Sequence, residues 1–589
     1  MPGITGFIGQ YITPFCSNSF TQLSNKAAKD FVDDIIQVRI NAISNDIGYQ
    51  YIETEQHLLI LDGDIFSLDS LDCANPANLL LSAHKNGNLA DCLTKANGYF
   101  NLFIYDKSSQ HVTLATDRYG MKPIYVAQQE NLIQGFSSEL KALTLHPDIS
   151  LEIDEAALNA FGQLGHMLNQ QTWFKSINRI PPATIMEIEL NSMAGTTQQY
   201  WSWSNISINT DISFDEATDQ LYYHFDKAMQ RCLSNLKQPT LAVTLSGGLD
   251  SRVILAAAKQ HFNGKIKTFT FGNPDCDDAT IAKQVAKLAK VENELRTIDA
   301  INWFDGRENG VWKTDGMFNV LHMHALGSAE DIATDSNYLL NGYLGDAVIG
   351  GSYLVNNHLE QGTSPELLAK RYPSLVESIE LNHAYFGSTK HDPIFIYNRG
   401  VRFIATGTDL LSSRLHNLKP FMDYDLIDFS YSLPDAYRFN SRIYNAMLLK
   451  YYPMYFKDIP WQQTGKPISI ANESGDSHQN VSVKRKLINL VKASPLAGIA
   501  HTVYRKINAS KGYTSYTDWM QQPQFKSYAN QLLMSEDAAI QQLISKEDIA
   551  ARLAHFYKMK PNNAESIGAL LTLAIYLEQL SKFRSINES

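Results

Sequence analysis

The chain has 589 residues, which gives room for two or three domains with a large buried core. Hydrophobic residues make up 44% of it and charged residues 19%, a composition that excludes wholesale disorder. The formal net charge of −11 argues against a nucleic-acid-binding surface, but it permits a nucleotide held by backbone amides and a metal ion. The longest apolar run, from Ile567 to Leu577, is too short to span a bilayer.

The N-terminus and the cysteines indicate where the protein works. The chain begins Met-Pro-Gly-Ile without a basic leader, so we expect no signal peptide. Its five cysteines are scattered and odd in number, which favours free thiols over disulfides or zinc. We therefore expect a cytoplasmic protein that binds neither membrane nor nucleic acid.

The first 200 residues are rich in strand patterns. Residues 98–106 alternate like a sheet strand and end at a Lys-Ser-Ser turn, and residues 111–117 are the natural hairpin partner. Two further blocks follow, at residues 117–125 and 136–143. Residues 213–236 then show helical spacing and lead into the central motif of the chain.

That motif lies at residues 241–252, where a buried strand, a turn of small residues and the start of a helix follow one another. Backbone N–H groups at such a turn point at one spot, and the helix dipole favours an anion there. Gly247 and Gly248 let the backbone approach a ligand, and Ser246 and Ser251 add hydroxyl donors. Asp250 would repel a phosphate directly, so we interpret it as a ligand of a magnesium ion that bridges phosphates.

Strands and helices alternate after this turn. Residues 265–272 form a strand pattern, an amphipathic helix opens at Asp277, and residues 293–298 form a third strand pattern. The alternation predicts a parallel sheet whose ligand lies at the carboxyl ends of the strands. The backbones of Leu245 and Phe271 would hold a base there, although Phe271 fits equally well as a core residue.

Three of these stretches resemble the asparagine synthetase family. The Ser-Gly-Gly-Leu-Asp-Ser turn is similar to the pyrophosphate loop of enzymes that split ATP into AMP and pyrophosphate. Residues 117–125 and 136–143 resemble that family's Asp-Arg-x-Gly-x-Lys-Pro-Leu-Tyr and Ser-Glu-x-Lys-Ala-Leu blocks. The resemblance implies an α+β, Ntn-type αββα sandwich over residues 1–205. A parallel-sheet α/β ATP-pyrophosphatase domain, adenine nucleotide alpha hydrolase-like and with C-terminal helices, would follow over residues 206–589.

A second glycine-rich turn at residues 338–351 resembles the family's Ser-Gly-Glu-Gly-Ser-Asp-Glu-Leu-Phe-Gly-Gly. The resemblance implies that Gly342 contacts the nucleotide and that Asp346 holds magnesium together with Asp250. Two carboxylates from two loops can hold one magnesium ion that bridges substrate oxygens. His322 and His324 are two residues apart, so we interpret them as ordinary residues on opposite faces of a helix.

The resemblance fails at the residues on which glutamine hydrolysis depends. The family's nucleophile is a cysteine after the initiating methionine, and this chain has Pro2. The family's Asn-Gly-Glu, whose amide stabilises an oxyanion, is Asp62-Gly63-Asp64, and its Leu-Asp-Gly is Ala96-Asn97-Gly98. An arginine expected near residues 48–50 is missing. We therefore expect the domain to keep its fold and to have lost glutaminase activity. Cys16 is the candidate for a substitute nucleophile.

Tyr343 stands where the family has a glutamate that acts as base toward ammonia. β-Lactam and carbapenam synthetases carry a tyrosine here, and the resemblance implies that it helps deprotonate a nitrogen already in the substrate. A tyrosine needs a depressed pKa or a carboxylate partner for that task. A packing tyrosine is the alternative interpretation.

Residues 459–466 resemble a loop that in relatives delivers a lysine to the acyl-adenylate and pyrophosphate. Gln462 and Gln463 match that lysine best, and Lys466 lies just beyond them. We take Lys466 as the candidate charge stabiliser, with Lys450 as the alternative. Residues 485–589 are expected to form helices that cover the sheet.

Together the patterns predict an ATP- and Mg²⁺-dependent amide ligase. It would adenylate a small-molecule or peptide carboxylate, and a substrate amine would then attack and release AMP. The nearest relatives by this logic are β-lactam synthetases and lasso-peptide cyclases, and a partner protein would fit as the carrier of a peptide substrate. One alternative is an asparagine synthetase fed with ammonia, or with glutamine supplied in trans. Another is a nucleotide-binding scaffold without turnover.

Overall fold

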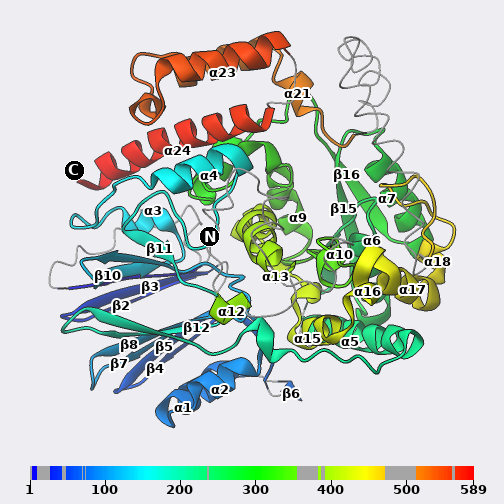
Figure 1. The fold of residues 1–589 in the computed structure, drawn as a ribbon, viewed down its shortest axis with the longest axis horizontal. Helices are drawn as coiled ribbons and strands as arrows, with labels where there is room; N and C mark the ends of the chain where they lie inside the picture. The colour runs from blue at the N-terminus through cyan, green and yellow to red at the C-terminus, as the bar shows by residue number, and fades with distance from the viewer. Residues whose placement is uncertain are drawn as a thin grey trace.

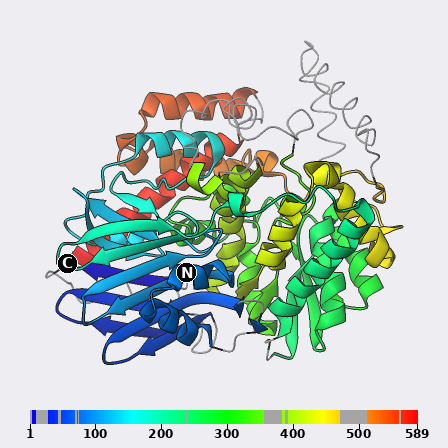
Figure 2. The same cartoon turned by 60° about the horizontal axis from the view of Figure 1, so that its bottom comes forward.

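The structure is a computed structural model that describes residues 3–9, 27–42, 48–68, 71–72, 75–234, 236, 238–354, 383–386, 392–470, 512–559 and 564–588. Within these ranges two sheets organise the chain, a 13-stranded sheet near the N-terminus and a 5-stranded sheet after residue 240. Both ribbon views show the two sheets side by side, each with its own helices (Figures 1 and 2).

The N-terminal sheet is antiparallel and folds into two facing layers, with helices outside each layer (Figure 1). Its longest strand, β5, is buried on both faces, as a strand inside a layered sandwich must be. Leu58 and Ile60 face the core between the layers, whereas Leu59 and Leu61 face α1 and α2. The expected αββα sandwich is confirmed. The strands are β1 (Gly3–Ile8), β2 (Ala27–Val32), β3 (Ile36–Ala42), β4 (Tyr49–Glu53), β5 (His57–Leu68), β6 (Leu71–Asp72), β7 (Ala96–Asp106), β8 (His111–Thr116), β9 (Tyr125–Gln129), β10 (Leu132–Ser137), β11 (Ile177–Arg179), β12 (Thr184–Glu189) and β13 (Ala194–Gln199).

The helices of this half lie on its two outer faces. On one face are α1 (Pro76–Lys85) and α2 (Leu89–Thr94), and on the other are α3 (Leu140–Leu143) and α4 (Glu155–Leu164). The predicted hairpin is also confirmed, because β7 pairs antiparallel with β8 from Asn101↔Thr116 to Asp106↔His111.

The second sheet is parallel, in the order β16-β15-β14-β17-β18. Its strands are β14 (Thr240–Thr244), β15 (Lys265–Gly272), β16 (Glu292–Thr297), β17 (Tyr338–Leu340) and β18 (His416–Leu418). Helices α5 (Phe214–Ser234), α6 (Leu249–His261) and α7 (Asp277–Ala289) accompany the first three strands. The predicted strand–helix alternation is therefore confirmed, and the carboxyl ends of the strands share one edge.

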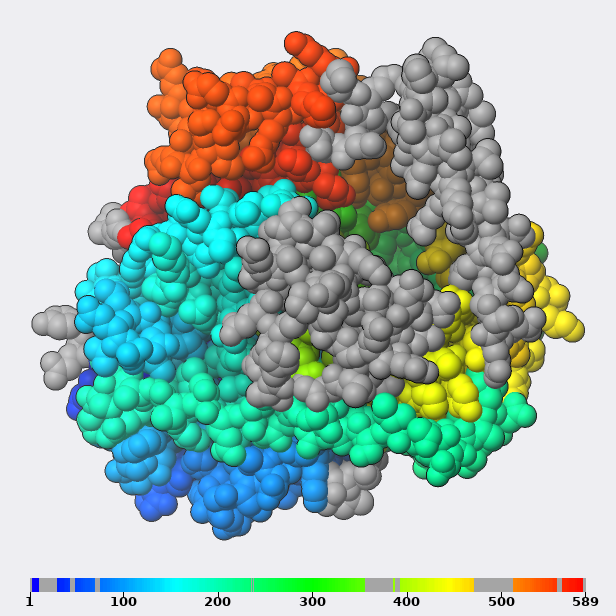
Figure 3. All heavy atoms as spheres, viewed as in Figure 1, coloured from blue at the N-terminus to red at the C-terminus, as the bar shows by residue number. Residues whose placement is uncertain are grey.

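Shorter elements complete the parallel half. They are α8 (Arg307–Lys313), α9 (Ala329–Asp335), α10 (Gly345–Val348), α12 (His383–Phe386), α13 (Asp392–Phe395), a π-helix (Ile396–Ala405), α14 (Thr406–Asp409), α15 (Tyr424–Ser432), α16 (Asp435–Arg438), α17 (Arg442–Tyr451) and α18 (Pro453–Phe456). Residues 180–235 run in blue-green across one face of the molecule and connect its two parts (Figure 3).

The C-terminal helices are α21 (Tyr516–Trp519), α22 (Pro523–Met534), α23 (Lys546–Met559) and α24 (Ala564–Glu588). We expected them to cover the sheet, but α24 packs on α22 and α8 and also contacts α4 of the N-terminal half. This packing joins the last helix to both halves of the chain, because α4 and α8 belong to one hydrophobic cluster with it. None of the helices in the described part of the chain is long and apolar enough to cross a membrane.

Candidate functional site

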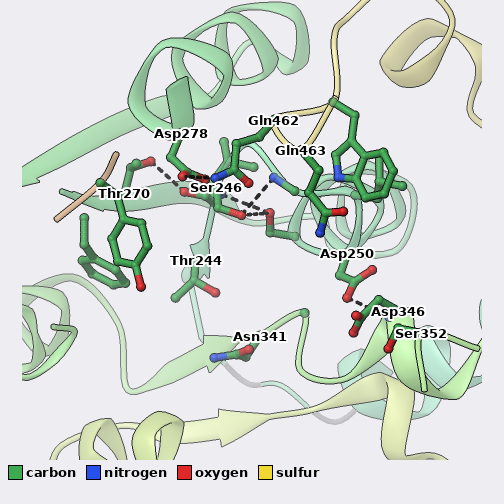
Figure 4. Close-up of a pocket in the computed structure, with 18 of the residues that line it drawn as sticks. Thr244, Ser246, Asp250, Thr270, Asp278, Asn341, Asp346, Ser352, Gln462 and Gln463 are labelled. Atoms are coloured by element: carbon green, nitrogen blue, oxygen red, sulfur yellow. Dashed lines mark hydrogen bonds between the residues drawn. The ribbon is translucent and has the colours of Figure 1, made fainter. Parts of the chain in front are cut away.

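A cavity of about 450 Å³ lies at the carboxyl ends of β14, β15 and β17 (Figure 4). This volume lies within the range of about 300–1,000 Å³ that small-molecule sites occupy. Eight of the residues singled out from the sequence line it, namely Leu245, Ser246, Gly248, Asp250, Ser251, Phe271, Gly342 and Asp346. Three others do not line it: Gly247, Tyr343 and Lys466.

The first backbone N–H groups of the phosphate turn, at residues 246–248, donate hydrogen bonds within the protein. The N–H of Ser246 donates to Ser251 Oγ at 3.0 Å, and that of Gly248 donates to Ser246 Oγ at 3.2 Å. The N–H of Gly247 donates to the Asp278 carboxylate at 2.8 Å. The sequence-based role of Gly247 as a direct phosphate donor therefore does not fit this geometry. The first turn of α6 borders the cavity, and its N-terminus has no side-chain cap, an arrangement that would suit an anion.

Asp278 ties a distant turn to this loop. Its second oxygen accepts a hydrogen bond from Gln462 Nε2 at 2.7 Å, which brings residues 461–463 to the rim of the cavity (Figure 4). Arg252, fully buried, donates to the carbonyl oxygens of Gly247, Ile459 and Pro460 at 3.1, 3.3 and 3.0 Å. Burial lowers the pKa of Arg252 to about 10 and burial raises that of Asp278. The buried Arg252 guanidinium thus links the start of this turn to the phosphate turn from inside the protein.

Two carboxylates face each other at the other end of the cavity (Figure 4). Asp250 Oδ2 accepts the backbone N–H of Asp346 at 2.9 Å, and its Oδ1 accepts the hydroxyl of Tyr444 at 2.9 Å. Burial, and then the charge of Asp346, raise the pKa of Asp250 to about 8. Asp346 reaches solvent through the cavity, yet burial of its carboxylate raises its pKa as well.

Two glycines let these carboxylates come together. A β-carbon on Gly342 would lie 2.7 Å from the backbone nitrogen of Ser251, and one on Gly345 would lie 2.7 Å from the carboxyl carbon of Asp250. The described residues hold no cluster of three or more His, Cys, Asp or Glu side chains that would bind a metal without help. The pair fits a magnesium ion that would take its other oxygens from phosphates and water. Burial raises the pKa of both carboxyls, the charge of Asp346 adds to the shift at Asp250, and a bound cation would favour their charged forms.

Tyr343 lies in the core next to this site and does not face the cavity. It is 2% exposed, and its hydroxyl has no hydrogen-bond partner among the described residues. The ammonium of Lys419 sits 5.2 Å from the centre of its ring. Burial raises the pKa of Tyr343 well above 10, which is opposite to what a base requires. This placement weighs for the packing interpretation.

The lysine expected on the 459–466 turn does not reach the cavity either. Lys466 pairs its backbone with Trp461 across the turn and is exposed, whereas Trp461, Gln462 and Gln463 line the cavity. The alternative, Lys450, is also exposed and pairs with Asp219 on α5. Gln462 and Gln463 therefore hold the positions that the resemblance matched to a lysine.

Sequence reasoning missed the other end of the cavity. His324 and Tyr513 line it, with their ring centres 5.4 Å apart in an edge-on arrangement. His324 follows a three-residue 3-10 helix (Val320–His322), so the helical interpretation of His322 and His324 was wrong. Burial lowers the pKa of His324 to about 3 and keeps its ring neutral. Nothing local in the sequence signals this pairing, because residues 324 and 513 meet only through the fold.

A second, smaller cavity of about 90 Å³ lies between the two halves. It borders Gly63 and Asp64, two of the three residues that stand in place of the family's Asn-Gly-Glu. Asp62 is fully buried and pairs with Lys122 at 2.6 Å, and Asp64 pairs with His416 at 2.5 Å. Asp62 thus has a cationic partner, and Asp64 contacts a histidine ring. Pro2 and Cys16 lie outside the described residues.

Comparison with known proteins agrees with this arrangement. A glutamine amidotransferase domain model matches residues 47–201, and an asparagine synthase model matches residues 220–390. Together they cover more than half of the chain. The chain belongs to the asparagine synthetase family.

Curated asparagine synthetases match in part of their length. The glutamine-hydrolyzing asparagine synthetase 3 of Bacillus subtilis is 32% identical over 31% of this chain and 29% of its own. Asparagine synthetase 1 of the same organism, also glutamine-hydrolyzing, is 24% identical over 46% of this chain and 41% of its own. The matches to these two synthetases therefore span less than half of their length. Among solved structures, the glutamine phosphoribosylpyrophosphate amidotransferase of B. subtilis reaches a TM-score of only 0.24. It is 8% identical and covers 52% of this chain and 92% of its own.

Proposed function

We propose that this chain is an ATP-dependent carbon–nitrogen ligase that forms an amide through an acyl-adenylate and releases AMP and pyrophosphate. The observation that carries the proposal is the Asp250–Asp346 pair beside the phosphate turn. Two neighbouring carboxyls with raised pKa values at the start of a helix are costly to ionise in the protein alone, and a Mg²⁺–pyrophosphate ligand would offset that cost.

The chain's own residues would divide the work along the cavity. The first turn of α6 and the hydroxyls of Ser246 and Ser251 would hold the phosphates. Asp250 and Asp346 would hold magnesium, which when bound neutralises charge on the departing pyrophosphate. Figure 4 shows Thr270 at the end opposite Asp346 and Ser352. The base would therefore lie toward Thr270, Phe271 and Tyr513, and the substrate carboxylate toward Ser352 and Ser441.

The nitrogen nucleophile is proposed to be an amine of a small molecule or peptide, as in β-lactam synthetases and lasso-peptide cyclases. The replaced glutamine motif supports this, since Asp62 pairs with Lys122 and Asp64 contacts the His416 ring. A partner protein that brings a peptide belongs to the same proposal. The proposal also includes a domain boundary near residue 205. It includes a cytoplasmic location as well, which rests on the cysteine pattern.

One alternative is supported by a specific finding. The curated relatives are named asparagine synthetases, which favours aspartate as the carboxylate and ammonia, or glutamine supplied in trans, as the nitrogen source. A scaffold that binds ATP without turnover is the remaining candidate.

The test is ATP–pyrophosphate exchange with purified protein, magnesium and a panel of carboxylates that includes aspartate and peptides. Exchange that depends on one of them supports the ligase, and its identity separates the two substrate classes. The product is then sought with ammonium and with amines as nucleophiles. ATP binding without exchange for any carboxylate would instead support the scaffold.

A further inference from the structure

The replaced residues of the amidotransferase-like pocket bind the second half of the chain. Asn97 stands in place of the family's aspartate and uses both ends of its amide across the interface. Its Nδ2 donates to Asp423 at 3.0 Å, and its Oδ1 accepts the backbone N–H of Tyr424 at 3.0 Å. Asp64, in place of the family's glutamate, forms the ion pair with His416. The substitutions that remove glutamine chemistry thus supply contacts to one segment, residues 416–424.

A third contact holds the middle of that segment. The hydroxyl of Tyr99 donates to the carbonyl of Asn417 at 3.4 Å and accepts the N–H of Lys419 at 3.0 Å. Asn97 and Tyr99 are 3% and 7% exposed, so these bonds form away from solvent. A buried polar group that loses its partner is costly, so these bonds specify the position of the segment strongly.

The same segment supports the magnesium-site loop from behind. Strand β18 pairs with β17, and the N–H of Asn341 donates to the carbonyl of Leu418 at 2.9 Å, immediately before Gly342. The Phe421 ring packs against Gly345, where a β-carbon would lie 2.7 Å from the ring. Gly345 immediately precedes Asp346, whose N–H donates to Asp250.

We infer that Asp64, Asn97 and Tyr99 are positioning residues for the adenylation site, and that the former glutaminase domain serves as a brace for it. The contacts run from these residues through segment 416–424 to the loop at 342–346, which carries Asp346. The inference rests on the proposed function in one respect: it assigns a role in the proposed reaction to a domain that no longer hydrolyses glutamine.

A simple domain-packing role predicts something different. Packing alone would lower stability when a contact is lost, while leaving turnover of the folded protein unchanged. A brace for the magnesium loop predicts that kcat for pyrophosphate exchange falls while the protein stays folded. A misplacement of about 1 Å at a reacting centre costs on the order of 100-fold, so we expect a loss of about 10- to 100-fold.

The experiment uses the full chain with Asn97→Ala, Asp64→Asn and the milder Tyr99→Phe, which removes only the hydroxyl. Lys107→Gln is the matched control, because it breaks a partly exposed ion pair with Glu53 in the same domain, away from the interface. Two readouts are taken on folded protein: kcat of carboxylate-dependent pyrophosphate exchange, and hydrogen exchange of amides in residues 342–350. The exchanged pair, Asp64→His with His416→Asp, should recover part of the loss.

The expected result is faster hydrogen exchange at 342–350 and lower kcat in the three interface variants, with neither change in Lys107→Gln. Faster exchange at 416–424 without any change at 342–350 or in kcat would overturn the inference. If the wild-type protein shows no pyrophosphate exchange with any carboxylate, the proposed function fails. The hydrogen-exchange readout still decides on the brace in that case.

Discussion

The two cavities of this chain treat their carboxylates in opposite ways. In the larger one, Asp250 and Asp346 face each other, and burial raises the pKa values of both. In the smaller one, Asp62 pairs with the Lys122 ammonium at 2.6 Å, and Asp64 lies 2.5 Å from the His416 ring. We propose that the larger cavity is a retained site, whose buried carboxylates await a metal–phosphate ligand. On the same proposal the smaller cavity is a retired site, whose carboxylates are used in contacts within the protein.

The largest effect is expected in the retained site. Asp250→Asn and Asp346→Asn should each lower magnesium-dependent pyrophosphate formation by orders of magnitude, because each removes one of two ligands for the ion. Isotope exchange between ATP and pyrophosphate measures this, with circular dichroism as the control for folding. Near-normal exchange in either variant would remove that residue from the magnesium site.

Replacing an aspartate with asparagine should change the stability of the protein in opposite directions in the two cavities. Asp62→Asn breaks a charge-assisted bond to Lys122 and should lower the free energy of unfolding by about 1.5–3 kcal/mol. Asp250→Asn should raise the free energy of unfolding in the absence of nucleotide. As the pH rises, a carboxyl whose pKa is raised in the folded protein ionises in the unfolded chain before it does so in the folded one. Ionisation of Asp250 therefore favours unfolding, and the asparagine removes this effect. This gain should be near zero below pH 4 and grow until about pH 8. Urea unfolding at pH 4 and pH 8 measures both, and equal losses in the two variants would erase the contrast.

A small effect is expected at the turn that borders the retained site. Lys466 is exposed and outside the cavity, so Lys466→Ala should leave pyrophosphate exchange near the wild-type rate. Gln463→Ala is the matched comparison, because Gln463 lines the cavity, and it should lower the rate of pyrophosphate exchange more than Lys466→Ala does. A large loss in Lys466→Ala alone would return this lysine to the role that the sequence suggested.

The smallest effect is expected at Tyr343. Its hydroxyl has no hydrogen-bond partner among the described residues and its pKa is raised, so Tyr343→Phe should change neither exchange nor amide formation appreciably. Both are followed in parallel once a substrate is known. A fall of about 10²–10⁴-fold in amide formation with exchange intact would establish Tyr343 as the base.

Local patterns in the sequence carried most of the fold. The strand predicted at residues 265–272 is β15 with the same bounds, and the helix predicted at 213–236 is α5, Phe214–Ser234. Both signals are periodic and local, which is why they suffice. Eight of the predicted site residues line one cavity for a related reason, since strand ends of a parallel sheet converge on one edge.

The predictions that differ from the structure concern positions whose surroundings are set by contacts between distant residues. Gly247 gives its amide to Asp278, which lies 31 residues further along the chain, and no local pattern announces that bond. Tyr343 and Lys466 were assigned by resemblance to active relatives, and resemblance fixes alignment but not the direction in which a side chain points. His324 and Tyr513 meet across 189 positions and were invisible for the same reason.

The most direct test of the contrast between the two cavities needs no knowledge of the substrate. Isothermal calorimetry of the wild-type protein is carried out with ATP in the presence of magnesium, and separately with glutamine. We predict saturable binding of ATP that disappears in Asp250→Asn, and no binding or hydrolysis of glutamine. Glutamine binding with release of glutamate, lost in Cys16→Ser, or failure of ATP to bind, would contradict the account.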